Sequence, residues 1–157
     1  MSTGDKPANR VQVTWVGGER FDAGRPGGPM ARFDGTAETG QSPVDALLSA
    51  LGSCASIDVV EILAKRRTPV SHLDVRAFGE RVSTHPRRFD RIMLEFRIDG
   101  EGIERVHAER AIDLAITRYC SVRESLSGRI AIEWTLALNG DQGVLINTAR
   151  VPGAAAE

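Results

Sequence analysis

The sequence predicts an α+β fold, because one long helical pattern lies between segments whose apolar residues alternate as in β-strands. The chain has 157 residues, of which 41% are apolar and 26% are charged. These values are close to the average of globular proteins, and the length suits one domain. We expect a single domain over residues 11–146, with flexible tails at 1–10 and 147–157. Strands and helices do not alternate regularly along the chain, so a doubly wound parallel sheet is not expected.

Five segments carry the alternation of apolar and polar residues that is typical of strands. They are residues 11–16, 30–33, 73–77, 92–98 and 130–138. The last two show the cleanest alternation, so each is expected to turn one face to a core. The segment 84–88 contains a proline between polar residues and is expected to form a hairpin loop between two of the strands.

The longest helix is predicted over residues 43–66. Ser42 and Asp45 have the spacing of a capping box, and a proline takes the first helical position. At about 1.5 Å per residue such a helix is roughly 36 Å long. That is long for a domain of this size, so we expect the helix to be central. A second helix is expected over 103–118, followed by a short turn with Ser121 as its N-cap.

Charge and composition exclude several classes of function. Twenty basic and 21 acidic side chains leave a net charge of −1, and aromatic residues are only 5% of the chain. This argues against binding to nucleic acid or to an anionic membrane. The longest uncharged apolar run, 46–57, is too short to cross a bilayer, and no secretory signal is visible. We therefore expect a soluble cytoplasmic protein without nucleic acid or membrane partners.

The two cysteines are the candidate reactive residues. Their separation of 66 positions excludes a CxxC redox turn and a local zinc pair. The three histidines are not spaced like metal ligands, either from each other or from the cysteines, so no metal site is expected. Cys54 lies within the predicted long helix, at the border of its apolar face, where ordinary packing of a buried thiol is the commoner explanation. Asp58 follows one turn later on the apolar side and is expected to pair with an arginine.

Cys120 has a different local setting. It precedes the predicted N-cap Ser121, where free backbone N–H groups favour a thiolate. Arg118 and Arg123 lie close in sequence and can add to this effect. On these local grounds Cys120 is expected to be the more acidic thiol. A small residue at a tight junction is the alternative explanation.

Two sequence segments together resemble one known family. Residues 42–63 read SPVDALLSALGSCASIDVVEIL, and residues 119–126 read YCSVRESL. In this order and at this separation they are similar to the OsmC and organic hydroperoxide resistance (Ohr) family, in its OsmC-like branch, with a likeness that covers roughly residues 11–138. The resemblance implies an intertwined homodimer in which long cysteine-bearing helices are wrapped by antiparallel sheets.

The resemblance also implies a chemistry without a cofactor. Proteins of this family include thiol peroxidases, in which the cysteine matching Cys54 attacks an organic hydroperoxide and becomes a sulfenic acid. The cysteine matching Cys120 then forms a disulfide with it, in a pocket that the paired chains create. An external dithiol, such as a lipoylated protein, reduces the disulfide. An arginine of the N-terminal region, held by a carboxylate near the start of the helix, stabilises the thiolate.

The sequence departs from this pattern at the supporting residues. The family's carboxylate commonly follows the proline directly, where this chain has Val44; the nearest acid is Asp45, which the capping box explains equally well. Arg20 is the favoured arginine, with Arg25 and Arg32 as alternatives. Two functions therefore remain open. One is a peroxidase of the oxidative stress response, and the other is a stress-associated or apolar-ligand-binding protein on the same fold without significant peroxidase activity.

Overall fold

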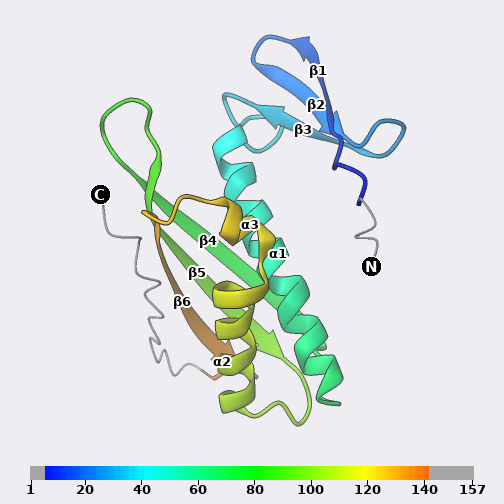
Figure 1. Ribbon diagram of the computed structural model, residues 1–157, viewed down its shortest axis with the longest axis vertical. Coiled ribbons are helices and arrows are strands. Elements are labelled where there is room, and N and C mark those ends of the chain that lie inside the picture. Colours follow the sequence, from blue (N-terminus) through cyan, green and yellow to red (C-terminus); the bar gives the residue numbers. More distant parts are fainter. Residues whose placement is uncertain (1–5, 142–157) are drawn as a thin grey trace. The chain divides into compact units, whose positions relative to one another are not determined.

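The computed structural model describes residues 6–141, which form two compact units divided between Leu47 and Leu48. The first unit contains β1 (Gln12–Gly17), β2 (Arg20–Gly24) and β3 (Met30–Asp34). Helix α1 (Pro43–Lys65) begins in the first unit and continues in the second. The second unit also contains β4 (His72–Arg81), β5 (Phe89–Asp99), α2 (Arg105–Leu114), the π-helix η1 (Ala115–Tyr119), α3 (Ser121–Ser125) and β6 (Ala131–Leu138). Figure 1 shows these elements, and the predicted α+β class is confirmed.

The domain limits stay a prediction. The expected C-terminal tail, residues 147–157, lies outside the described residues, as do the first five residues of the expected N-terminal tail.

The first unit is an antiparallel sheet with one apolar face. Trp15 is paired with Phe21, and Phe21 with Phe33, so these three rings share a face. Val13 extends this face along β1, where Val13 is 63% exposed and Trp15 is 65% exposed. Strand β2 was not predicted, because its five residues are followed at once by a glycine- and proline-rich run. The chain therefore leaves a row of large apolar side chains open on this sheet.

The second unit is a sheet in the order β4-β5-β6. Strands β4 and β5 form the predicted hairpin and pair antiparallel, whereas β5 and β6 pair parallel. The expectation of antiparallel sheets is therefore wrong for this pair. The reason is the helical connection between β5 and β6, since a crossover of that kind returns the chain to the same end of the sheet.

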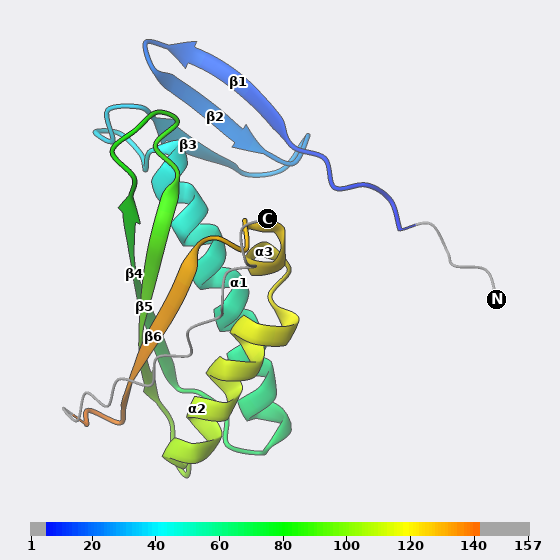
Figure 2. The same ribbon diagram turned by 60° about the vertical axis from the view of Figure 1, so that its left-hand side comes forward.

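The helices α1 and α2 cover one face of this sheet, as Figure 2 shows. Large apolar side chains from the helices and from β5 and β6 pack in the space between them. The fully buried examples include Leu51, Val59, Leu63, Leu94, Phe96, Ile98, Ile112, Ile116, Ile132 and Leu136. This core holds the second half of α1 in place against the sheet.

Helix α1 begins at the predicted proline and ends one residue earlier than expected. Gly52 lies on its buried face, where an added Cβ would be 3.7 Å from Val75 Cγ1 of β4. That distance is ordinary van der Waals contact, so the helix lies close to the sheet but leaves room for a methyl group. The turn after Gly52 carries Cys54, whose position is thereby set by the packing of α1 on β4.

The other flank of α1 is apolar but uncovered. Ile57 is 61% exposed and Val60 is 42% exposed, although both are aliphatic. On length and composition alone, α1 is the one helix among the described residues that is long and apolar enough to cross a membrane. Its other face packs on the sheet, however, which is the arrangement of a core helix with one apolar side left open.

Candidate functional site

The two thiols of the second unit interact with each other within one chain. Cys54 is half-buried on α1, at the border of the apolar face, where the sequence places it. Cys120 is 3% exposed and lies between η1 and α3. Both are free cysteines, and they lie close enough for the side chain of Cys54 to raise the pKa of the Cys120 thiol. The structure therefore brings together the two residues that the sequence singles out, without help from a second chain.

The backbone around Cys120 determines where its sulfur points. The backbone N–H of Cys120 donates to the carbonyl of Ala115 at 2.8 Å, five residues back, which closes the π-helix η1. Cys120 then leaves helical geometry and acts as the N-cap of α3, its Sγ accepting from the Arg123 N–H at 3.4 Å. The prediction that Ser121 is the N-cap is wrong by one residue, because Ser121 is already the first helical residue.

Burial raises the pKa of Cys120 to about 11. The Arg123 N–H bond to the sulfur lowers the pKa, but the hydrogen bond with Cys54 raises it further. The expectation that Cys120 would be an acidic thiol is therefore wrong. Desolvation of the thiolate outweighs the stabilisation that the nearby backbone N–H groups give it. At neutral pH Cys120 is a neutral thiol.

The burial of Cys120 and the partial exposure of Cys54 predict how the two cysteines react with a probe. In the folded, reduced protein at pH 8, iodoacetamide is expected to label Cys54 and to leave Cys120 free. Labelling of Cys120 should accelerate about tenfold per pH unit as its thiolate fraction rises toward pH 11. Peptide mapping by mass spectrometry measures both rates, with the unfolded protein as the control in which both react. Equal labelling of the two cysteines at pH 8 would contradict the conclusion that Cys120 is a buried, neutral thiol.

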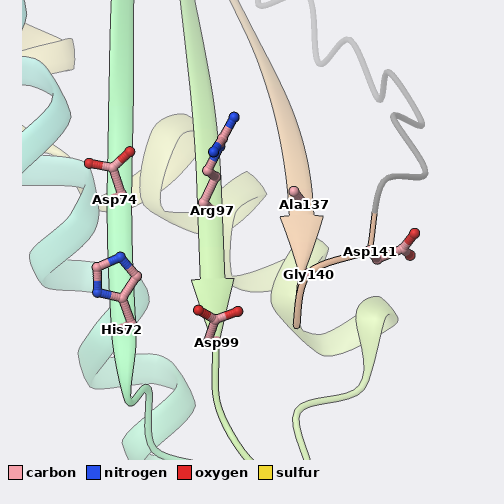
Figure 3. A pocket seen from close by; sticks show the side chains of 7 residues that line it. All are labelled: His72, Asp74, Arg97, Asp99, Ala137, Gly140 and Asp141. Carbon is pink, nitrogen blue, oxygen red and sulfur yellow. The ribbon is translucent and has the colours of Figure 1, made fainter.

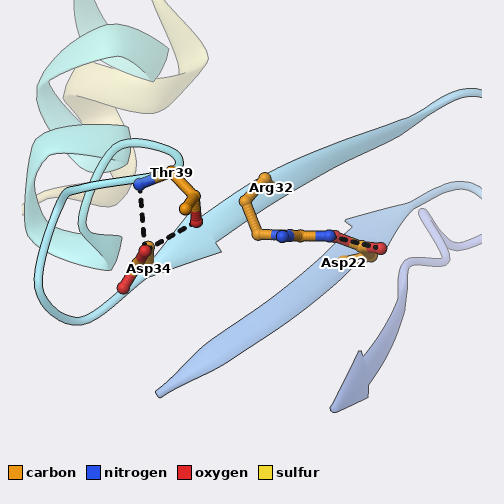
Figure 4. A network of polar contacts seen from close by, with 4 residues as sticks. All are labelled: Asp22, Arg32, Asp34 and Thr39. Atoms are coloured by element: carbon orange, nitrogen blue, oxygen red, sulfur yellow. Dashed lines mark hydrogen bonds and ion pairs between the residues drawn. The ribbon is translucent and has the colours of Figure 1, made fainter. Parts of the chain in front are cut away.

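The three candidate arginines belong to the first unit. The Arg32 guanidinium is held by Asp22 through Nε–Oδ1 and Nη2–Oδ2 distances of 2.5 and 3.2 Å, as Figure 4 shows. The hydrogen bond between them raises the pKa of Arg32 and lowers the pKa of Asp22. Arg20 and Arg25 are exposed. Arg32 is thus engaged by a carboxylate of its own sheet, and a role for Arg20 stays a prediction.

Asp45 forms the predicted capping box. Its Oδ2 accepts from Ser42 Oγ at 2.7 Å, and its backbone N–H donates to the same Oγ at 3.1 Å. Nine residues separate Asp45 from Cys54, which is about 13.5 Å along the helix axis and about half a turn around it. In its own chain Asp45 therefore caps α1 and does not face Cys54. A role for Asp45 in the reaction stays a prediction.

Asp58 lies one turn beyond Cys54 on α1 and is half-buried. Burial raises the pKa of its carboxyl, Glu61 raises it further, and Lys65 opposes the change. The expected arginine partner is not found, since no ion pair to Asp58 forms among residues 6–141. The charged form of Asp58 is consequently stabilised only weakly.

A second candidate location lies on the exposed face of the second sheet. A pocket of about 380 Å³ is lined by side chains that include His72 and Asp74 of β4 and Arg97 and Asp99 of β5, as Figure 3 shows. Both charge signs are present and no cysteine lines it. Over the described part of the chain, no group of three His, Cys, Asp or Glu side chains is placed to hold a metal ion. The thiol pair is therefore the better candidate for chemistry.

Comparison with known proteins identifies the family. The OsmC-like protein family model matches residues 35–135, a stretch that includes both cysteines. The chain belongs to the OsmC-like family. The resemblance seen in the sequence is thereby confirmed. Protein YhfA of Escherichia coli K12 is 35% identical to this OsmC-like chain over 124 residues, covering 78% of the chain and 92% of YhfA.

Solved structures show the same fold. The OsmC-like protein from Mycoplasma pneumoniae has a TM-score of 0.72 at 18% identity, covering 85% of this chain and 98% of its own. The organic hydroperoxide resistance protein OhrB of Bacillus subtilis has a TM-score of 0.58 at 14% identity, covering 82% and 98%. At these identities the likeness concerns the fold.

Proposed function

We propose that this OsmC-like protein is a soluble, cytoplasmic thiol peroxidase that reduces organic hydroperoxides, with Cys54 as the attacking and Cys120 as the resolving cysteine. The observation that carries the proposal is the closeness of two free thiols that are 66 positions apart in sequence, since the Cys54 side chain raises the pKa of Cys120. A fold shared with a protein named for organic hydroperoxide resistance supports the choice of substrate class.

The different surroundings of the two thiols support this division of roles. Cys54 is the more exposed, so a hydroperoxide has access to it. Cys120 is buried, and its raised pKa keeps it protonated at neutral pH, which makes it a poor first nucleophile. A protonated thiol next to Cys54 is nevertheless well placed for the second step, in which it meets an oxidised sulfur.

The reaction balances with the two cysteines and an external dithiol. The Cys54 thiolate attacks the distal oxygen of ROOH, an S–O bond forms, the O–O bond breaks, and RO⁻ takes up a proton to leave as ROH. Cys54 is then a sulfenic acid, oxidised by two electrons. Cys120 sulfur attacks Cys54 sulfur, hydroxide leaves and takes the thiol proton to become water, and a disulfide remains. A dithiol, for which a lipoylated protein is our candidate, reduces the disulfide and becomes a disulfide itself.

A homodimer is the second part of the proposal. Each unit leaves an apolar surface open, namely the face of the first sheet with Val13 and Trp15 and the flank of α1 with Ile57 and Val60. Soluble monomers rarely expose contiguous apolar surface of this kind, and its burial is the main driving force of association. We propose that a second copy of the chain covers these surfaces.

Stopped-flow kinetics with pre-reduced protein test the proposed function. Mixing with cumene hydroperoxide or tert-butyl hydroperoxide should consume about one equivalent in a single turnover, and continued consumption should require added dithiol. The variant Cys54→Ser is the control and should consume none. If the wild-type protein consumes no more than Cys54→Ser, the peroxidase is excluded.

The alternative is a stress-associated or apolar-ligand-binding protein on the same fold, without significant peroxidase activity. It is favoured by the engagement of Arg32 with Asp22 and of Asp45 with Ser42. Without a rearrangement, Arg32 is not free to stabilise a thiolate and Asp45 is not free to hold an arginine. In that case the two thiols are redox-silent, and hydroperoxide leaves the mass of the reduced protein unchanged.

A further inference from the structure

Strand β6 ends in a turn that reverses the chain. Asn139 has a φ of 50° and Gly140 a φ of 73°, and the N–H of Asp141 donates to the carbonyl of Leu138 at 2.9 Å. Two consecutive residues with positive φ, closed by this hydrogen bond, define a type I′ turn, for which Asn-Gly is a preferred sequence. Turns of this type join the two antiparallel strands of a hairpin. Figure 3 shows Gly140 and Asp141 at the end of β6.

Hydrogen bonds to two neighbouring parts of the chain hold this turn in place. The side-chain amide of Asn139 forms two of them with the backbone of Gly100, at 2.9 and 3.2 Å. The Asp141 carboxylate accepts from Arg105 Nη2 of α2 at 2.8 Å. Arg105 Nη1 also lies 3.4 Å from the Leu136 carbonyl, which therefore points to the outer edge of β6. The direction in which the chain leaves the turn is thus set by the described residues.

Strand β6 has an open backbone edge on the side away from β5. It comes last in the order β4-β5-β6, and among residues 6–141 no other strand pairs with it. The N–H of Asn139 donates to the carbonyl of Ile98 on β5 at 2.9 Å. Hydrogen-bonding directions alternate along a strand, so the N–H and C=O groups of Ile132, Trp134 and Leu136 point away from β5. An unpaired edge of this kind is a template for a further strand.

The residues that follow the turn suit this edge. Residues 142–146 read QGVLI, and their valine, leucine and isoleucine are uncharged and apolar, with two of the three β-branched as strands prefer. A two-residue turn fixes the register, so that Val144 is opposite Thr135 and Leu145 is opposite the buried Trp134. Because the segment is tethered by the turn, it meets the edge at a far higher effective concentration than a second chain does.

We infer that residues 142–146 pair antiparallel with β6 as a fourth strand of the second sheet. In this arrangement their backbone bonds the N–H and C=O groups of β6 that point away from β5, and Leu145 joins the buried face beside Trp134. The segment closes this edge, so a second copy of the chain cannot extend the sheet at β6. The proposed dimer is then restricted to other surfaces, such as the first sheet and the open flank of α1. The inference concerns the fold and does not rest on the proposed peroxidase activity.

Pairs of engineered cysteines test both the pairing and its register, in a chain that also carries Cys54→Ser and Cys120→Ser. Thr135→Cys with Val144→Cys places two thiols opposite each other in a pair that is not hydrogen-bonded, where the Cα atoms are about 4.5 Å apart and a disulfide can form. Mild oxidation should then remove about 2 mass units from the single chain. The matched control is Thr135→Cys with Leu145→Cys, whose side chains point to opposite faces of the sheet and should cross-link at least about tenfold more slowly.

The outcomes of the cross-linking are decisive in each direction. Rapid disulfide formation within one chain by the first pair alone supports the inference. Equal rates for the two pairs, or no disulfide in either, overturn it. A disulfide that forms only between two chains also overturns it, because the edge of β6 is then occupied by a second copy.

The wild-type chain gives a second measurement that needs no substitution. In the expected register the Hα atoms of Thr135 and Val144 face each other, so a nuclear Overhauser effect between them should be present. In a chain shortened to end at Asp141, the amide hydrogens of Trp134 and Leu136 should exchange at least about tenfold faster than in the full chain. The Thr135 amide faces β5 and should keep its rate, which makes it the internal control. Absence of the Overhauser effect, or unchanged exchange in the shortened chain, contradicts the pairing.

Discussion

The variant Cys120→Ser is expected to accumulate an oxidised Cys54 instead of a disulfide. After one equivalent of cumene hydroperoxide, the wild-type chain should lose about 2 mass units, as two thiol hydrogens leave. The variant should gain about 16 mass units as a sulfenic acid, which dimedone traps. The reason is the closeness of the two thiols, since the Cys54 side chain raises the pKa of Cys120. Intact-mass spectrometry measures both changes.

The control for this experiment is Cys54→Ser, which should show neither change. Because the thiols meet within one chain, the wild-type disulfide should be intramolecular, and a non-reducing gel should show no covalent dimer. A covalent dimer that depends on both cysteines would show that the reacting sulfurs come from different chains. An unchanged wild-type mass would favour the redox-silent alternative.

The variant Ile57→Glu is expected to convert the proposed homodimer into a monomer of 17.0 kDa. Ile57 is 61% exposed in the single chain, so a charge there costs little unless another chain covers it. Within a dimer the same carboxylate is buried without a partner, a change severe enough to separate the chains. Size-exclusion chromatography with light scattering at micromolar concentration measures the mass.

Val106 provides a matched control, because it is also aliphatic and 61% exposed, but lies on α2. Val106→Glu should leave the dimer intact, and both variants should keep the circular dichroism of the folded chain. A wild-type protein that is monomeric at these concentrations would contradict the dimer. A dimer that tolerates Ile57→Glu would place the interface elsewhere.

The sequence predicts those features that depend on neighbours in the chain. Helix α1 is predicted by its capping box and by apolar residues that recur every three or four positions. The hydrogen bonds between Ser42 and Asp45 are those that a capping box implies. The hairpin of β4 and β5 follows from alternation and an intervening loop. Strand β2 was missed because its pairing with β1 and β3, rather than its own five residues, makes it a strand.

The misprediction of the acidity of Cys120 comes from tertiary burial. Local N–H groups suggested an acidic Cys120, but the packed surroundings of the sulfur decide its pKa. In the same way, the sequence shows Arg123 as one of several arginines near a cysteine. Only the folded chain shows that its Nε is buried without an acceptor among residues 6–141. Patterns along the chain carry no measure of desolvation, so they could locate the two cysteines but not their protonation states.

The π-helix η1 has a consequence for comparing this chain with others. Its hydrogen bonds span five residues instead of four, so the segment 115–119 contains one residue more than a regular α-turn over the same path. In a relative whose helix is regular here, this segment has one residue fewer before the second cysteine. Since each helical residue turns the chain by about 100°, an ungapped alignment through this segment would match the thiol to a side chain on another face. An alignment of this chain with such a relative needs a single-residue gap before Cys120.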